Sequence, residues 1–170
     1  MRSIELVLDA DSDAAVRAAW SALVDTDLPS LGRHPSPSNA PHVTLAAGAA
    51  LPVPTGLAAR LPTRLRLGGL LLFPAGPGRS VVVRAIVLDD ELIAFHRAVH
   101  DTGDGTAPID AVDTTLPGAW SPHVTLARRV RDDDLPRAVA ALRHTPLPET
   151  LGVAGVRHWD GETRTITPVG

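Results

Sequence analysis

The chain contains no cysteine, no tyrosine and no lysine, so all 16 of its basic residues are arginine. Without cysteine it has no disulfides, no thiolate metal ligands and no cysteine nucleophile. Without lysine it cannot form a Schiff base, use a P-loop lysine or pass through a covalent lysine–nucleotide intermediate. The absence of tyrosine excludes a tyrosine nucleophile. The side chains left for chemistry are therefore His, Asp, Glu, Ser, Thr and Arg.

An excess of positive charge and long apolar runs are missing as well. The 170 residues carry a net charge of −3 with a pI near 6.1, which argues against a protein that binds genomic DNA through a dense basic surface. No apolar run approaches the roughly 20 residues that a bilayer span needs. The first residues, MRSIELVLD, start a strand-like pattern and lack the long apolar stretch of a signal peptide. We expect a cytoplasmic monomer that contacts neither membranes nor genomic DNA.

Hydrophobic periodicity predicts an α+β fold with antiparallel sheets and helices on their outer faces. The expected helices span residues 12–24, 89–100 and 132–143, with a short one at 55–61, and the expected strands span residues 4–8, 64–73, 80–88, 153–159 and 163–167. Asp11 or Ser12 is the expected N-cap of the first helix, and Trp20 belongs to its buried face. Strands outnumber helices and several form hairpins, a pattern typical of this fold class.

One six-residue string, PHVTLA, occurs twice, at residues 41–46 and 122–127, although the two halves of the chain otherwise have little in common. A chance recurrence of this length is on the order of one in a thousand in so short a chain. Each half also contributes a helix. The length suits one compact domain, so we expect residues 1–170 to form a single domain of two similar lobes with one motif each.

The alternation of side chains along a strand gives each copy of the string a polar and an apolar face. His42 and Thr44 point one way and the intervening aliphatic residues the other, and His123 and Thr125 repeat this arrangement. Two such strands, one per lobe, would present two imidazoles and two hydroxyls across a groove. A neutral histidine can then take a proton from the attacking group while a protonated one donates to the leaving oxygen. The pattern therefore predicts metal-free acid–base chemistry at phosphorus.

The two H-V-T-L elements, about eighty residues apart, resemble those of the two-histidine (2H) phosphoesterase superfamily, in its bacterial 2′-5′ RNA ligase or RNA 2′,3′-cyclic phosphodiesterase branch. The order of the predicted elements also resembles that family's two-lobed fold. The resemblance implies a phosphodiesterase that acts on cyclic phosphates or 2′-5′ linkages without metal or cofactor. It further implies that His42, Thr44, His123 and Thr125 are catalytic. The second motif continues as PHVTLAR, and an arginine at that position, here Arg128, is expected to contact the phosphate.

The scarcity of aromatic residues departs from the family pattern. Family members often stack a base on a Tyr or Phe near the groove, but this chain has only Phe73 and Phe95, so we expect a tryptophan to serve instead. Trp120 is the first candidate, either as a stacking residue for the substrate or as a core anchor for the second motif. Trp159 is a weaker candidate. His34, in the Pro- and Ser-rich loop before the first motif, is a further expected substrate contact.

Few aromatics and a net negative charge favour a small cyclic nucleotide or a short RNA end over a long single strand, whose binding relies on stacking and basic grooves. Two alternatives remain. The protein could be a non-catalytic module that binds phosphorylated nucleotides or RNA ends with the same residues. It could also be a metal hydrolase that uses His96 and His100 with Asp101 or Asp104, although the H-E-x-x-H pattern is absent. We favour solvated surface histidines for that pair.

Overall fold

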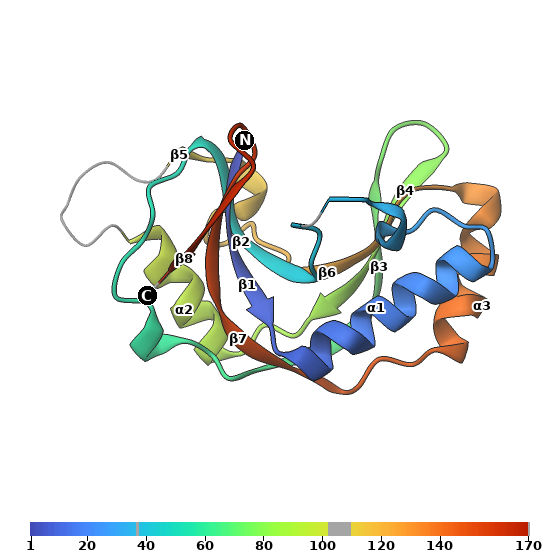
Figure 1. Ribbon diagram of the computed structural model, residues 1–170, viewed down its shortest axis with the longest axis horizontal. Coiled ribbons are helices and arrows are strands. Elements are labelled where there is room, and N and C mark those ends of the chain that lie inside the picture. Colours follow the sequence, from blue (N-terminus) through green and yellow to red (C-terminus); the bar gives the residue numbers. More distant parts are fainter. Residues whose placement is uncertain (37, 102–109, 170) are drawn as a thin grey trace.

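The computed structural model describes residues 1–36, 38–101 and 110–169 (Figure 1). The helices in these residues are α1 (Ala10–Asp25), α2 (Asp90–His100) and α3 (Leu135–His144). The strands are β1 (Arg2–Leu8), β2 (His42–Ala50), β3 (Arg64–Pro74), β4 (Arg79–Ile86), β5 (Asp110–Ala111), β6 (His123–Arg131), β7 (Thr150–Asp160) and β8 (Thr165–Val169). The predicted α+β class is confirmed.

All pairings between the described strands are antiparallel, and they join the eight strands into one sheet. This sheet has two parts, each called a sheet below, which meet along two short seams. One sheet has the order β8-β7-β1-β2 with β5 at its edge, and the other has the order β3-β4-β6. At the first seam β2 pairs with β6 through Val43 and Val124 alone. At the second, residues 150–152 of β7 pair with residues 64–66 of β3. Strand β7 belongs to both sheets because its remaining residues pair with β1.

Each of the first two helices begins with an aspartate cap. The Asp9 carboxylate accepts a hydrogen bond from the backbone N–H of Ser12, and the Asp89 carboxylate accepts one from Leu92. An aspartate just before a helix satisfies one of its free N–H groups. The prediction of Asp11 or Ser12 as the first cap was wrong, because the chain leaves β1 directly into the helix and Asp9 still has extended backbone geometry.

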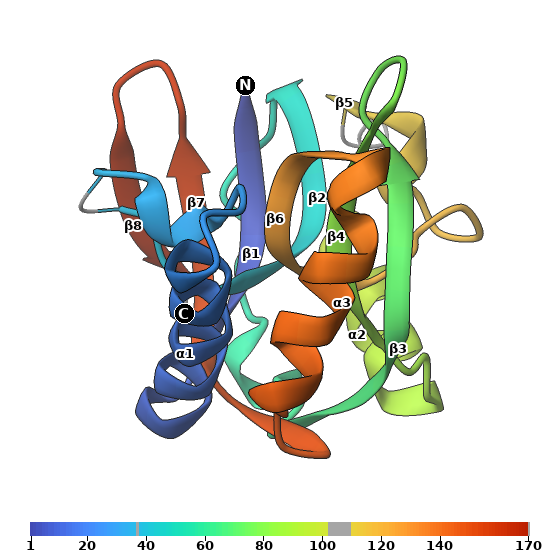
Figure 2. The same cartoon turned by 90° about the vertical axis from the view of Figure 1, so that its right-hand side faces the viewer.

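The helices cover the two sheets in an order different from that of the chain (Figures 1 and 2). Helix α1 follows β1, yet it packs beside α3 against β6 of the other sheet and against β7. Helix α2 comes from the middle of the chain and packs against β2. Trp20 of α1 is 2% exposed, which confirms its predicted place on the buried face. The two sheets and their helices therefore share one continuous core that includes Leu6, Val43 and Val124.

The boundaries of several elements differ from the prediction. The motif strands run on to Ala50 and Arg131, well beyond the six-residue strings. The predicted helix at residues 132–143 opens with a 3₁₀ turn at Asp132–Asp134, and the short helix expected at residues 55–61 is a 3₁₀ turn at Ala58–Arg60. The sequence also predicts a Gly- and Asp-rich loop at residues 102–117. Residues 102–109 lie outside the described part of the chain, and the described remainder contains β5 and a 3₁₀ turn at Asp113–Thr115. No described helix is long and apolar enough to cross a membrane.

Candidate active site

The two motifs lie side by side where the sheets meet. Val43 and Val124 are cross-strand partners and are fully buried, whereas His42, Thr44, His123 and Thr125 are half-buried. Because side chains alternate along a strand, the four polar residues share the sheet surface opposite the two valines. We call this surface the motif face. Continuing the antiparallel register by one residue sets each motif histidine opposite the threonine of the other motif.

Both motif histidines are oriented by the same backbone contact. The Nδ1 atom of His42 lies 2.8 Å from the carbonyl oxygen of Ala40, and that of His123 lies 2.6 Å from the carbonyl oxygen of Ser121. A carbonyl only accepts, so Nδ1 carries the proton in each ring and Nε2 is left for chemistry. The proline of each motif lies between the histidine and its acceptor and restricts the backbone of the preceding residue. The two imidazoles are therefore positioned in the same way.

The surroundings of His42 include a buried carboxylate. Oε1 of Glu5, on β1, lies 3.6 Å from Nε2 of His42 and accepts a hydrogen bond from the Ser3 hydroxyl at 2.6 Å. Its Oε2 accepts a hydrogen bond from Nε of Arg157, on β7, at 2.7 Å. Burial alone would raise the pKa of Glu5, but His42, Arg157 and the two hydrogen bonds together lower it below its ordinary value. Glu5 is therefore ionised at neutral pH.

The surroundings of His123 are aromatic and cationic. Its ring lies 4.9 Å, centroid to centroid, from the ring of Phe73 on β3, with the two planes tilted by 56°. Burial lowers the pKa of His123, and the charges of His42 and Arg128 lower it further, against the raising effect of the Ser121 carbonyl. His123 is therefore neutral at pH 7. Arg128 is exposed on β6, three residues beyond Thr125, and its charge acts on His123.

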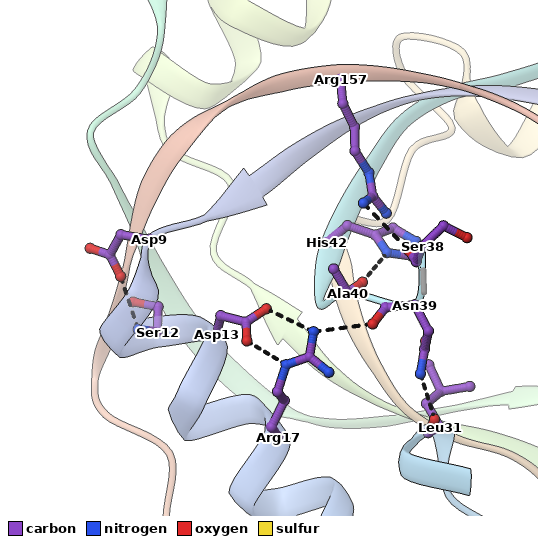
Figure 3. A network of polar contacts seen from close by, with 10 residues as sticks. All are labelled: Asp9, Ser12, Asp13, Arg17, Leu31, Ser38, Asn39, Ala40, His42 and Arg157. Atoms are coloured by element: carbon purple, nitrogen blue, oxygen red, sulfur yellow. Dashed lines mark hydrogen bonds and ion pairs between the residues drawn. The ribbon is translucent and has the colours of Figure 1, made fainter. Parts of the chain in front are cut away.

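Polar contacts hold the loop that precedes the first motif (Figure 3). Arg17 of α1 pairs with Asp13 and donates a hydrogen bond to the backbone oxygen of Asn39 at 3.1 Å. The Asn39 amide in turn donates to the backbone oxygen of Leu31 at 2.8 Å. His34 is exposed in this loop, and its Nδ1 accepts a hydrogen bond from the N–H of Ser36. Among the described residues no hydrogen bond joins the His34 side chain to the motif face.

Two tryptophans bind the backbone of the motif threonines. Nε1 of Trp120 donates to the carbonyl oxygen of Thr44 at 2.8 Å, and Nε1 of Trp20 donates to that of Thr125 at 3.0 Å. The motif strands pair at one residue only and then separate, so these carbonyls need partners from elsewhere. The ring of Trp120 also stacks on His96 at 3.9 Å with parallel planes. These contacts favour the anchoring alternative for Trp120.

His96 and His100, on α2, bind the next carbonyl oxygen along β2. Nε2 of His96 lies 3.0 Å from the carbonyl oxygens of both Leu45 and Thr115, and Nε2 of His100 lies 3.2 Å from that of Leu45. The expectation of solvated surface histidines was wrong for His96, which is 3% exposed, because its ring binds backbone carbonyl oxygens that have no strand partner. Among the described residues no three His, Asp or Glu side chains are placed to hold a metal ion. Asp104, named above as a possible ligand, lies outside the described residues.

Comparison with known proteins supports the family resemblance that the two motifs indicate. The sequence profile of the 2′-5′ RNA ligase superfamily matches residues 12–163, nearly the whole chain. The chain belongs to this superfamily. Usb1 from Kluyveromyces marxianus shares its fold, with a TM-score of 0.56 over 98% of this chain and 96% of Usb1, at 15% sequence identity. No curated protein matches the chain. The predicted membership of the two-histidine phosphoesterases is thus confirmed.

Three residues near the superfamily motifs were missed in the sequence. Glu5 is the one charged residue within the apolar stretch IELVL, and such a residue in a buried strand is a signal that could have found it. Arg157 gives no comparable local signal. The sequence favoured a tryptophan over Phe73 as the stacking residue, although the Phe73 ring is the one that lies against a motif histidine. Trp159, the weaker candidate, shares a face with Arg157 because it lies two residues further along β7.

We expect His96 to make the folding stability of this protein acid-sensitive. Burial, and then the charge of His100, lower the pKa of His96 from 6.5 to about 4. Between these values the unfolded chain binds more protons than the folded one, so stability is present above pH 6.5 and is lost as the pH falls toward 4. At about 1.4 kcal/mol per unit, the loss is on the order of 3 kcal/mol.

Urea unfolding of the wild type and His96→Gln at pH 7 and pH 4.5 measures this loss. Glutamine can still donate to the Leu45 carbonyl but does not titrate, so the variant should lose less stability on acidification than the wild type. His144→Gln, at an exposed position at the end of α3, is the matched control and should behave like the wild type. Equal acid sensitivity of the wild type and His96→Gln would assign the loss to other groups.

Proposed function

We propose that this chain is a metal-independent phosphodiesterase that hydrolyses 2′,3′-cyclic phosphates, at RNA ends or in cyclic nucleotides, or related 2′-5′ phosphodiesters. The observation that carries the proposal is the matched placement of two imidazoles, each with Nδ1 on the carbonyl oxygen two residues upstream and Nε2 left for chemistry. Each has a threonine hydroxyl on the same sheet surface. Membership of the 2′-5′ RNA ligase superfamily supports this class of substrate.

The reaction needs one proton acceptor and one proton donor. Nε2 of one neutral histidine takes a proton from water as the water oxygen forms a bond to phosphorus. Nε2 of the second, protonated histidine gives its proton to the ribose oxygen as the bond from that oxygen to phosphorus breaks. Thr44, Thr125 and Arg128 hold the non-bridging oxygens and stabilise the charge that develops on them. The product is a phosphate monoester, and proton exchange with solvent restores both histidines.

The motif face also offers surfaces for a nucleobase. Phe73 lies against His123, and Trp159 lies beyond Arg157 on the same sheet surface. Stacking on one aromatic ring contributes about 1–3 kcal/mol per base and tolerates different bases. The proposed substrate is therefore a mononucleotide or a short RNA end, which needs one stacking ring beside the phosphate rather than a long basic channel.

Turnover of the four nucleoside 2′,3′-cyclic phosphates in excess EDTA tests the proposal. We expect hydrolysis of at least one of them at an unchanged rate with chelator, and none by the double variant His42→Ala/His123→Ala, which serves as the blank. Activity lost in EDTA and restored by a divalent metal would indicate a metal hydrolase. Binding of the cyclic phosphates in a thermal-shift assay without any turnover would indicate the binding module.

A further inference from the structure

The two motif histidines occur in the same sequence string and make the same backbone contact, but the groups around them differ in charge. A carboxylate oxygen of Glu5 lies 3.6 Å from Nε2 of His42. His123 instead has the Phe73 ring on one side and the charge of Arg128 nearby. A nearby carboxylate favours the charged imidazolium, whereas burial beside an aromatic ring and a cation favours the neutral imidazole. Two titratable groups with opposing surroundings are suited to opposite roles in acid–base catalysis.

Glu5 is built into the sheet as a fixed charge. It is 4% exposed, and in the register it lies opposite Thr44 on one side and Arg157 on the other, so all three side chains project from the motif face. Ser3 binds Oε1 and Arg157 binds Oε2. A buried carboxylate is costly unless it is paired and hydrogen-bonded, and here both oxygens have a partner. The orientation of Oε1 toward His42 is therefore held from two strands.

The distance between the Glu5 carboxylate and the His42 ring leaves the proton on Nε2 of His42 free to react. At 3.6 Å from Nε2, Oε1 is too far away for a hydrogen bond but close enough for a strong electrostatic effect. The proton on Nε2 can therefore be donated to a substrate oxygen while the carboxylate stabilises the charged ring. Glu5 itself is too buried to contact a substrate, which makes it a positioning residue rather than a catalytic one.

We propose, on the basis of the phosphodiesterase function inferred above, that Glu5 assigns the roles of the two histidines, with His42 as the acid and His123 as the base. Water gives a proton to Nε2 of His123 as its oxygen bonds to phosphorus. His42 gives the proton on Nε2 to the departing ribose oxygen as the bond from that oxygen to phosphorus breaks. After turnover His42 is neutral and His123 is protonated, and solvent exchange returns the starting state.

The pH dependence of kcat/KM in Glu5→Gln tests this assignment on the preferred cyclic phosphate. The wild type should give a bell-shaped profile, with the acidic limb set by the base and the alkaline limb by the acid. Removing the negative charge should move the alkaline limb about one pH unit lower and leave the acidic limb in place, with an activity loss of about tenfold on the alkaline side. Glu149→Gln, at an exposed position before β7, is the matched control and should keep the wild-type profile.

Glu5→Gln leaves Arg157 buried without its charge partner and could unfold the chain. The double variant Glu5→Gln/Arg157→Met removes both charges and keeps the side-chain volumes close to those of the wild type. It should show a smaller shift of the alkaline limb in the same direction. A profile unchanged in both variants, or a shift of the acidic limb instead, would overturn the assignment.

A second measurement does not depend on activity and so separates this inference from the proposed function. NMR of the imidazole rings gives the protonated fraction of each histidine at a chosen pH. At pH 7 we expect the two rings to differ in the wild type, with His123 the less protonated of the two because its burial and the charge of Arg128 disfavour its cation. The ratio of protonated to neutral His42 should fall about tenfold in Glu5→Gln, with no such change at His123. Equal fractions in the wild type would overturn the role of Glu5 even in an active enzyme.

Discussion

Replacing either motif histidine with alanine is expected to lower kcat/KM for a 2′,3′-cyclic phosphate by about 10²–10⁴-fold, the usual contribution of a general acid or base. His42 and His123 each offer Nε2 to the motif face, and neither is replaceable by the other because the reaction needs both a donor and an acceptor. The chain contains no lysine, cysteine or tyrosine that could take over either role.

The double variant should be only slightly less active than the less active of the two single variants, because residues that act as one unit give strongly non-additive effects. Steady-state kinetics in EDTA of His42→Ala, His123→Ala and the double variant check this. The matched control is His144→Ala, at an exposed position at the end of α3, which should retain full activity. Circular dichroism establishes that each variant is folded. Near-complete retention of activity in one single variant would rule out the two-histidine mechanism.

Replacing Trp20 with alanine is expected to destabilise the protein by about 3–5 kcal/mol, the range for a large aromatic residue removed from a core. Trp20 is 2% exposed between α1 and the sheet, and its indole N–H holds the carbonyl oxygen of Thr125. Such a loss is a large part of the 5–15 kcal/mol by which folded domains are typically stable. It should also loosen the strand that carries the second motif.

Trp20→Phe separates packing from hydrogen bonding. Phenylalanine fills most of the space but leaves the Thr125 carbonyl without its donor, so the expected loss is about 1–3 kcal/mol. Trp159→Ala, at a half-buried position on β7, is the control for the loss of a tryptophan and should cost less than Trp20→Ala. Urea unfolding followed by circular dichroism measures all three variants. A loss below about 1 kcal/mol in Trp20→Ala would contradict its role as the anchor of the second motif.

The amino-acid sequence by itself determined the features that rest on local spacing. The alternation within PHVTLA sets the histidine and the threonine on one face of a strand, whatever lies around that strand. Apolar periodicity gave the three helices and most of the strands, since burial on one side imposes the same spacing in any fold. The proline before each histidine likewise acts on its own backbone. The motifs, the superfamily and the α+β class were therefore readable from the chain.

Tertiary structure alone decided which residues surround the two histidines. Glu5 and Arg157 lie 152 positions apart in the chain and meet only because β7 pairs with β1 in a particular register. Phe73 lies beside His123 because the hairpin of β3 and β4 packs along β6. No periodicity encodes such cross-strand neighbours, because register depends on how whole sheets close around the core. The sequence thus gives two equivalent histidines, and the sheet pairing makes them different.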